Sequence, residues 1–320
     1  MAHVKETVLN FGPAGELVGI LSRPGEAGDG PSKSADLAVV ILNAGVLHRV
    51  GPNRMHVRLA RSLAAQGTPC LRFDLPGIGD SRALGGKEGM LEENVIGMRA
   101  ALDVLERRGV ADRFLVFGLC SGADHAFILA CVDPRVIGIA IVDPTRTFPT
   151  RKALLLKLLG PARRPEVWLR LITGRYRLFS KWRDSFRSGR AKGGLTSPSQ
   201  ELRRAREELS KLVERDVKIC YLITGGRGEY RYREQLFDAF PEVDLRRTTR
   251  IEIFPNAAHT FPREADRLAL EAVVGDWVDE TARCQTGSSD EVGEAAELEL
   301  DREAAPAGGE VRRPDPSASW

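Results

Sequence analysis

Hydrophobic residues in this chain follow two spacings that alternate along the sequence. Continuous apolar runs at 37–42 and 136–142 are typical of strands that are buried on both faces. Segments 55–66 and 91–107 instead carry apolar residues at helical spacing. Strands that alternate with helices predict a mostly parallel sheet covered by helices, which is the α/β class.

The remaining patterns extend this alternation toward both ends of the chain. Two short alternating stretches, 4–9 and 17–22, predict an antiparallel hairpin before the parallel strands. Further strands are expected at 69–73, 113–119, 217–224 and 250–254, and further helices at 121–131, 233–240 and 263–278.

Charge divides the chain into segments that the hydrophobic pattern alone does not separate. Residues 144–216 hold 19 Lys and Arg against 7 Asp and Glu, and their apolar spacing is helical. We therefore expect a core domain in two parts, 1–143 and 217–280, with a basic helical cap inserted between them. Residues 281–320 hold 4 basic and 9 acidic residues and few large apolar ones, which predicts a largely disordered tail.

The overall composition is that of a globular protein. Hydrophobic residues make up 42% of the chain, charged residues 28%, and the formal net charge is +3. The five cysteines form no CxxC pair, which argues against a disulfide framework and a zinc site. No secretory signal pattern and no long apolar run is present, so we expect a cytoplasmic protein without a membrane span.

The segment with the most specific chemistry lies where a predicted strand meets a predicted helix. It reads Gly118-Leu119-Cys120-Ser121-Gly122. A nucleophile on such a sharp turn needs small residues two positions before and after it, which favours Cys120 over Ser121. The N-terminal end of the following helix favours the thiolate form of Cys120.

Here the sequence resembles the α/β-hydrolase fold family, over about residues 1–143 and 217–280. The stretch from Asp74 to Ser81 is similar to the DxxGxGxS segment of many members. The resemblance is strongest to cap-bearing bacterial hydrolases related to serine aminopeptidases, and 43–54 resembles hydrolases encoded with exosortase systems. It implies an oxyanion hole formed by the backbone N–H groups of Ala44 and Ser121. A cysteine where most members have serine is a departure from the pattern.

The resemblance also implies a base and an acid for the thiol. His259, just past the last predicted strand, matches the position of the family's catalytic histidine. Glu229 is the first carboxylate after the strand at 217–224 and is our preferred acid. Asp143, at the end of the preceding strand, is the alternative, since the fold has this second acid position. His48 and Val46, in the loop after the strand at 37–42, are expected to line the pocket.

The basic insertion interleaves aromatic residues with its arginines. Trp168, Tyr176 and Trp182 are expected to form an apolar wall for an acyl substrate. The positive charge would attract a coenzyme A thioester or an acidic acyl carrier protein, or it is simply the solvated face of packed helices. We expect no metal, no cofactor and no nucleic-acid partner, and the oligomeric state stays open.

Three functions are consistent with these residues. The first is a hydrolase that cleaves an ester, thioester or lactone through an acyl intermediate on Cys120. The second is an acyltransferase or cyclase that uses the same three residues. The third is a non-catalytic scaffold with this fold that binds an acyl ligand or a partner protein.

Overall fold

The structure is a computed structural model. It describes residues 3–25, 36–86, 89–159, 198–225 and 230–303. The chain divides into two compact units, Met1–Val278 and Asp279–Trp320. The first unit holds the sheet and the candidate site.

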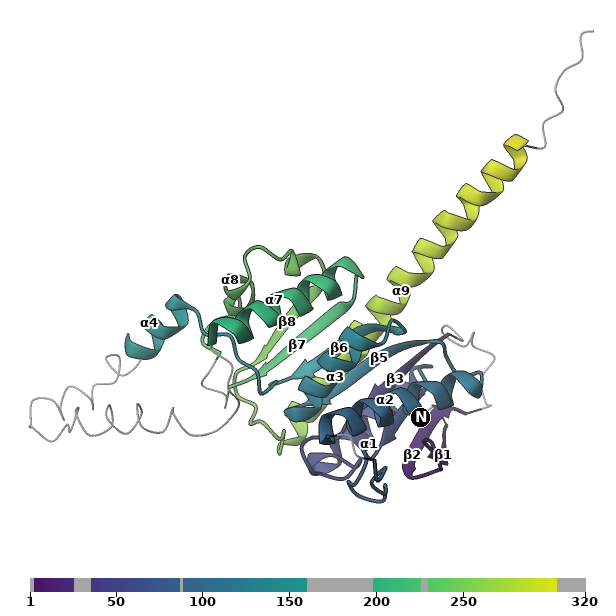
Figure 1. Cartoon of the computed structure of the whole chain (residues 1–320), viewed down its shortest axis with the longest axis horizontal. Helices are drawn as coiled ribbons and strands as arrows, with labels where there is room; N and C mark the ends of the chain where they lie inside the picture. Colours follow the sequence, from purple (N-terminus) through teal and green to yellow (C-terminus); the bar gives the residue numbers. More distant parts are fainter. Residues whose placement is uncertain (1–2, 26–35, 87–88, 160–197, 226–229, 304–320) are drawn as a thin grey trace, which may run out of the picture. The chain divides into compact units, whose positions relative to one another are not determined.

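The sheet has eight strands in the order β1-β2-β4-β3-β5-β6-β7-β8 (Figure 1). Strand β2 pairs antiparallel with both β1 and β4, and the other neighbours are parallel. The predicted α/β class and the N-terminal hairpin are thereby confirmed. The strands are β1 (Val4–Phe11), β2 (Leu17–Pro24), β3 (Leu37–Ile41), β4 (Cys70–Phe73), β5 (Arg113–Leu119), β6 (Val136–Val142), β7 (Lys218–Thr224) and β8 (Thr249–Phe254).

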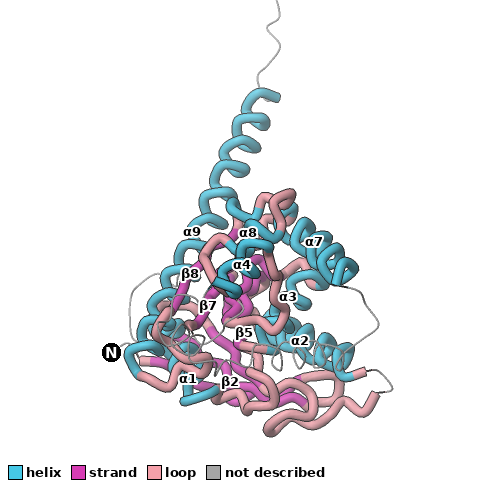
Figure 2. Tube along the Cα trace, turned by 90° about the vertical axis from the view of Figure 1, so that its left-hand side faces the viewer, coloured by secondary structure: helices cyan, strands magenta, loops and turns pink. Residues whose placement is uncertain are grey.

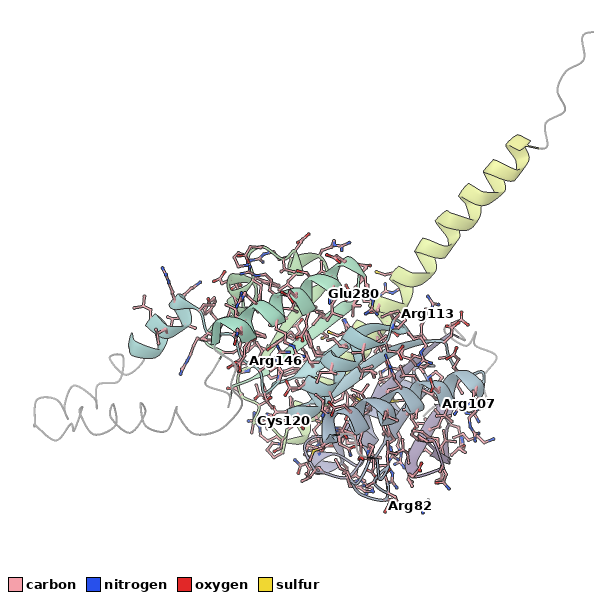
Figure 3. All side chains as sticks on the ribbon, viewed as in Figure 1. Arg82, Arg107, Arg113, Cys120, Arg146 and Glu280 are labelled. Atoms are coloured by element: carbon pink, nitrogen blue, oxygen red, sulfur yellow. The ribbon has the colours of Figure 1, made fainter. Side chains whose placement is uncertain are left out.

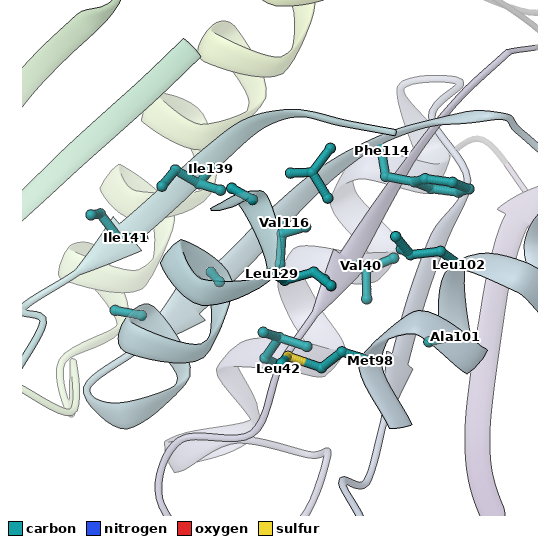
Figure 4. Packing of buried hydrophobic residues seen from close by; sticks show 14 of the residues in the cluster. Val40, Leu42, Met98, Ala101, Leu102, Phe114, Val116, Leu129, Ile139 and Ile141 are labelled. Carbon is teal, nitrogen blue, oxygen red and sulfur yellow. The ribbon is translucent and has the colours of Figure 1, made fainter. Parts of the chain in front are cut away.

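Helices cover both faces of the sheet, as Figure 2 shows from the side. They are α1 (Met55–Ala65), α2 (Met90–Arg107), α3 (Ser121–Val132), α4 (Arg151–Leu159), α7 (Pro198–Glu214), α8 (Gln235–Ala239) and α9 (Glu264–Glu303), with short 3-10 helices η1 (Pro52–Arg54) and η3 (Leu245–Arg247). Helices α2, α3 and α7 contribute to one hydrophobic cluster, which also takes in Val40 and Leu42 (Figure 4). Val39 and Ile41 are equally buried but point to the opposite face, because side chains alternate along a strand. This two-sided burial explains the continuous apolar run at β3.

The strand register brings the carboxyl ends of the parallel strands to one edge of the sheet. Leu119, the last residue of β5, pairs with Val142, the last residue of β6. Thr224 at the end of β7 pairs with Phe254 at the end of β8. Residues that directly follow these strands therefore gather at this edge, where open α/β sheets bind their ligands.

The ends of the inserted segment are helical, as its apolar spacing predicts. They form α4 and α7, while the middle of the expected cap, 160–197, lies outside the described residues. None of the helices in the described part of the chain has the length and apolar character that a membrane span needs.

The last helix is longer than the pattern indicates. We expected it to end at residue 278 and to be followed by disorder from 281, but α9 continues to Glu303. Eight of the ten residues at 294–303 are Ala, Glu or Leu, which have high helix propensity, and the first proline after them is Pro306. Low hydrophobicity argues against a packed core, but it does not prevent a helix.

Candidate active site

The turn between β5 and α3 holds Cys120 in a strained backbone conformation. Its φ is 58° and its ψ is −121°, which few residues other than glycine adopt. A Cβ on Gly118 would lie 2.1 Å from the carbonyl oxygen of Gly122, and one on Gly122 would lie 2.4 Å from that of Asn43. Both positions therefore require glycine, as the sequence predicts.

The thiol of Cys120 lies at the carboxyl edge of the sheet, at the N-terminus of α3 (Figure 3). Its side chain is half-buried. The first N–H groups of a helix have no intrahelical acceptor, so the N–H of Ser121 can donate to an oxygen beside the sulfur. The thiol does not hydrogen-bond any residue that the structure describes, so its contact with a base belongs to the proposal below.

His259 and Asp143 are brought together although they lie 116 positions apart in the sequence. His259 follows β8, Asp143 follows β6, and His259 Nδ1 lies 2.7 Å from Asp143 Oδ2. Asp143 is 4% exposed, and its φ of 44° is unusual for a residue other than glycine. Its carboxylate also accepts hydrogen bonds from Thr224 N (2.9 Å) and Thr224 Oγ1 (2.6 Å). These bonds fix the carboxylate, and the histidine is left with Nε2 for chemistry.

The loop that carries His259 is held by residues far away in the sequence. The Asn53 side chain donates to the carbonyl oxygen of Thr260 at 2.9 Å. Arg263 donates to the carbonyl oxygen of Asn256, and the ring of Phe261 packs edge-on against Phe254 at a centroid distance of 5.6 Å. Sequence reasoning did not find these positioning residues, because nothing in the pattern marks Asn53 as a partner of a loop 207 positions away.

The loop after β3 approaches the turn at Cys120, which we call the elbow, from the side of β5 that faces away from β6. Ala44 is buried, and the N–H of Gly45 donates to Ser121 Oγ at 2.9 Å. Gly45 has a φ of 62°, which suits glycine in this turn. The two residues expected to form an oxyanion hole, Ala44 and Ser121, are thus linked through a bond between the loop and the elbow.

Comparison with known proteins finds likeness in structure but not in sequence. No protein-family model matches the chain, and no curated protein matches it. The esterase Pf2001 of Pyrococcus furiosus is 14% identical, with a TM-score of 0.52 over 87% of this chain and 91% of that one. A hypothetical protein of Pseudomonas aeruginosa, PA2218, is 15% identical, with a TM-score of 0.53 over 88% and 94%. At these identities the likeness concerns the fold alone.

The chain has the α/β-hydrolase fold. The resemblance inferred from the sequence is confirmed at the level of the fold, whereas the Cys nucleophile and the subfamily stay predictions. The elbow, the His259 loop and the loop after β3 occupy the edge of the sheet where this fold is expected to have its active site.

The stretch from Asp74 to Ser81 is held together by hydrogen bonds to the Asp74 carboxylate. Asp74 is fully buried and accepts hydrogen bonds from Arg49 N (2.6 Å) and Asp80 N (3.1 Å), and from the Arg49 guanidinium. A Cβ on Gly79 would lie 2.4 Å from the Asp74 carboxylate. Asp74 also accepts a bond from the Asn43 side chain at 3.2 Å, which ties this turn to the loop after β3.

One group of side chains in the described residues has the spacing of metal ligands. It consists of His48, Asp74 and Asp80. Arg49, however, pairs with both carboxylates, at 2.8 Å in the case of Asp80. The guanidinium supplies the positive charge that a cation would bring, so these residues do not fit a metal site.

The other predicted pocket residues have different outcomes. His48 lies beside Asp80, with its Nε2 3.3 Å from the carboxylate, and Val46 is 87% exposed. Neither observation tests the role of His48 and Val46 in substrate binding, which stays a prediction. Trp168, Tyr176, Trp182 and Glu229 lie outside the described residues.

Two further histidines are part of the packing. His56 is completely buried beside Phe117. Burial lowers its pKa to about 4, with a smaller contribution from the charge of Arg72. His125 lies 3.3 Å from Asn94 Nδ2 through its Nε2, and burial lowers its pKa as well.

Proposed function

We propose that the protein is an acyl hydrolase that cleaves an ester, thioester or lactone through an acyl intermediate on Cys120. The observation that carries the proposal is the 2.7 Å contact between His259 Nδ1 and Asp143 Oδ2, at the edge of the sheet where the Cys120 elbow lies. A carboxylate that holds Nδ1–H fixes the tautomer in which Nε2 is a base.

In the proposed reaction, His259 Nε2 takes the proton of the Cys120 thiol and the thiolate attacks the acyl carbonyl carbon. The N–H groups of Ser121 and Ala44 stabilise the oxyanion of the tetrahedral intermediate. The intermediate collapses to an acyl-Cys thioester, and the leaving group takes the proton from His259. A water molecule, deprotonated by His259, then attacks the thioester, and the acid and the free thiol are released.

Asp143 is proposed as the acid in place of Glu229. Its support is geometric, because Asp143 is buried, accepts two hydrogen bonds from Thr224 and contacts the histidine ring. A carboxylate that is held by three donors keeps the imidazole in one orientation throughout the reaction.

The acyl-Cys intermediate is shared with acyl transfer and cyclisation, which differ only in the nucleophile that resolves it. The basic insertion supports an acyl group delivered on a phosphate-bearing or acidic carrier, such as coenzyme A or an acyl carrier protein. Water is the acceptor in our proposal because it needs no further binding site.

The test is the intact mass of the protein after it is mixed with p-nitrophenyl esters and acyl-coenzyme A thioesters. We expect an acyl adduct or steady turnover in the wild type, and neither in Cys120→Ala. Cys131→Ala is the matched control, because Cys131 is also half-buried and lies on α3, the helix that follows Cys120, and burial raises its pKa to about 11. Unchanged turnover in a folded Cys120→Ala protein would refute the mechanism, and no turnover of any ester by the wild type would favour the non-catalytic scaffold.

A further inference from the structure

The loop that leaves β6 carries Asp143, and it is attached to the region of the elbow on both sides of that residue. Before Asp143, the carbonyl oxygen of Val142 accepts a hydrogen bond of 2.9 Å from Cys120 N. After it, Thr145 N donates to Asp124 Oδ1 at 3.2 Å, and the Thr145 hydroxyl donates to Asp124 Oδ2. Asp143 therefore lies between two attachments that both lead back to the elbow and the helix that follows it.

Asp124 is the residue that connects this helix to the loop. It lies in the first turn of α3, and its own N–H donates to the carbonyl oxygen of Cys120 at 3.4 Å. Its side chain crosses to the loop after β6, where Arg146 N makes a longer contact of 3.5 Å with Oδ1, beside the two bonds from Thr145. An ionised carboxylate only accepts hydrogen bonds, so it suits a position that faces several donors, whereas an amide would present N–H groups to some of them.

The backbone of Asp143 needs this support because it is strained. Its φ of 44° is one that residues other than glycine rarely adopt, and such a conformation persists only where the surrounding structure fixes it. Pro144 comes next and has no backbone N–H, so Thr145 N is the first main-chain donor after Asp143 that can anchor the loop. In this conformation the Asp143 carboxylate lies 2.7 Å from His259 Nδ1.

The residues that follow are anchored to other helices. Arg146, which is labelled in Figure 3, pairs with Glu208 on α7 at 2.8 Å. The carbonyl oxygen of Phe148 accepts a hydrogen bond of 3.3 Å from the side chain of Gln235 on α8. Loss of the bonds to Asp124 would therefore loosen the end of the loop that carries Asp143, while the inserted segment would stay attached to α7 and α8.

We propose that Asp124 is a positioning residue, which holds the loop after β6 in the conformation that brings the Asp143 carboxylate to His259. The inference rests on the proposed function and adds to it a residue that acts through Asp143. The contribution of Asp124 should therefore disappear when residue 143 can no longer serve as the acid.

The first test measures kcat/KM for p-nitrophenyl acetate in Asp124→Asn, in Asp143→Asn and in the double variant. Asp124→Asn alone should lower kcat/KM by about tenfold or more, because a small displacement of a catalytic group is costly. In the Asp143→Asn background the same substitution should change kcat/KM by less than about twofold. An equal loss in both backgrounds would overturn the inference, because a general disturbance of the fold lowers activity in either one.

The second test acts on the other partner of the bond. Thr145 is exposed, so its variants should fold even if Asp124→Asn does not. Thr145→Val removes the hydroxyl donor and should lower kcat/KM about fivefold, whereas Thr145→Ser keeps the donor and should retain wild-type activity. A valine variant as active as the serine variant would overturn the inference.

Asp133→Asn is the matched control for Asp124→Asn. Asp133 follows the other end of α3, and its carboxylate likewise accepts hydrogen bonds from a backbone N–H, that of Arg135 at 3.1 Å, and from a side chain, the Arg135 guanidinium. It lies before β6 and therefore at the opposite edge of the sheet from Asp143. We expect kcat/KM of Asp133→Asn to stay within about twofold of the wild type.

A measurement without turnover separates this inference from the proposed reaction. The Nδ1–H of a histidine that is held by a carboxylate gives a proton NMR signal far downfield, and its loss in Asp143→Asn assigns it to His259. We expect the signal to be lost or broadened in Asp124→Asn and retained in Asp133→Asn. Its loss in Asp124→Asn would support the positioning role even if the wild type turned over no ester, in which case only the proposed reaction fails. An unchanged signal in Asp124→Asn would overturn the positioning role, whatever the turnover.

Discussion

His56 should make the stability of this protein depend on pH in a narrow and unusual window. The ring is completely buried, and neither ring nitrogen has a hydrogen-bond partner among the described residues. Burial and the nearby charge of Arg72 lower its pKa from 6.5 to about 4. An unfolded histidine takes up a proton near pH 6.5, whereas folded His56 stays neutral until about pH 4. The unfolded state therefore gains stability as the pH falls between these values.

The magnitude follows from the same two pKa values. Each pH unit between 6.5 and 4 costs ~1.36 kcal/mol of unfolding free energy, so the loss is about 2 kcal/mol at pH 5 and about 3 kcal/mol at pH 4. Above pH 7 the contribution is constant. Glu6, whose pKa is lowered to about 2 chiefly by its hydrogen bond with Arg61, gives a further loss only below pH 4.5.

The assay is urea unfolding of the wild type and His56→Leu at pH 7.5, 6.5, 5.5 and 5. We expect the wild type to lose about 2 kcal/mol more than the variant between pH 7.5 and pH 5, whatever the stability of the variant at pH 7.5. His3→Leu is the control, because His3 is exposed and its replacement should leave the pH dependence unchanged. Parallel curves for the wild type and His56→Leu would refute the reasoning.

Three further substitutions probe the candidate site. Asp143→Asn should lower kcat by roughly 10³-fold with the fold intact by circular dichroism, because an amide stabilises the wrong tautomer of His259; activity within threefold of the wild type would contradict the assignment. Ser121→Ala removes the acceptor for Gly45 N–H and should lower kcat about tenfold, with little effect on KM, in steady-state ester hydrolysis. A change in KM with kcat unaltered would argue against a role of Ser121 in positioning the oxyanion loop. Gly122→Ala sets a Cβ 2.4 Å from the Asn43 carbonyl and should lower the unfolding free energy by about 2–3 kcal/mol in urea, whereas Gly275→Ala on α9, which meets only the flexible end of Gln66, should not.

The sequence was sufficient to find the elbow. The glycines at 118 and 122 select Cys120 over Ser121 through local sterics, and the structure reproduces those close contacts with main-chain atoms. The alternation of buried runs and helical patterns likewise predicts the sheet and the helices on both of its faces. These features are readable because each depends on residues that are near one another in the sequence.

The contact between His259 and Asp143 was not decided by the sequence. Two carboxylates, Glu229 and Asp143, followed neighbouring strands, and the spacing allowed either to reach the histidine. The parallel register of β6 with β7, and of β7 with β8, places Asp143 at the edge of the sheet to which the chain returns with His259 after β8. The same holds for Asn53, whose bond to the His259 loop spans 207 positions.

The burial of His56 and the length of α9 are two further features that the local sequence pattern did not predict. The spacing at 55–66 places a helix correctly, but it does not show that the ring of His56 packs on Phe117 from β5. Low hydrophobicity in the acidic segment after residue 281 was interpreted as disorder, although its helix propensity favours α9 as far as Glu303.

The sequence by itself determined the fold class and the sharp turn at Cys120, and it pointed to the loop that carries His259. These depend on periodicity and on short-range sterics, which a linear pattern records. Only the tertiary structure decided that Asp143 contacts His259 and that His56 is buried. Each of these depends on strand register and side-chain packing between segments up to 116 positions apart, and no local pattern encodes such distances.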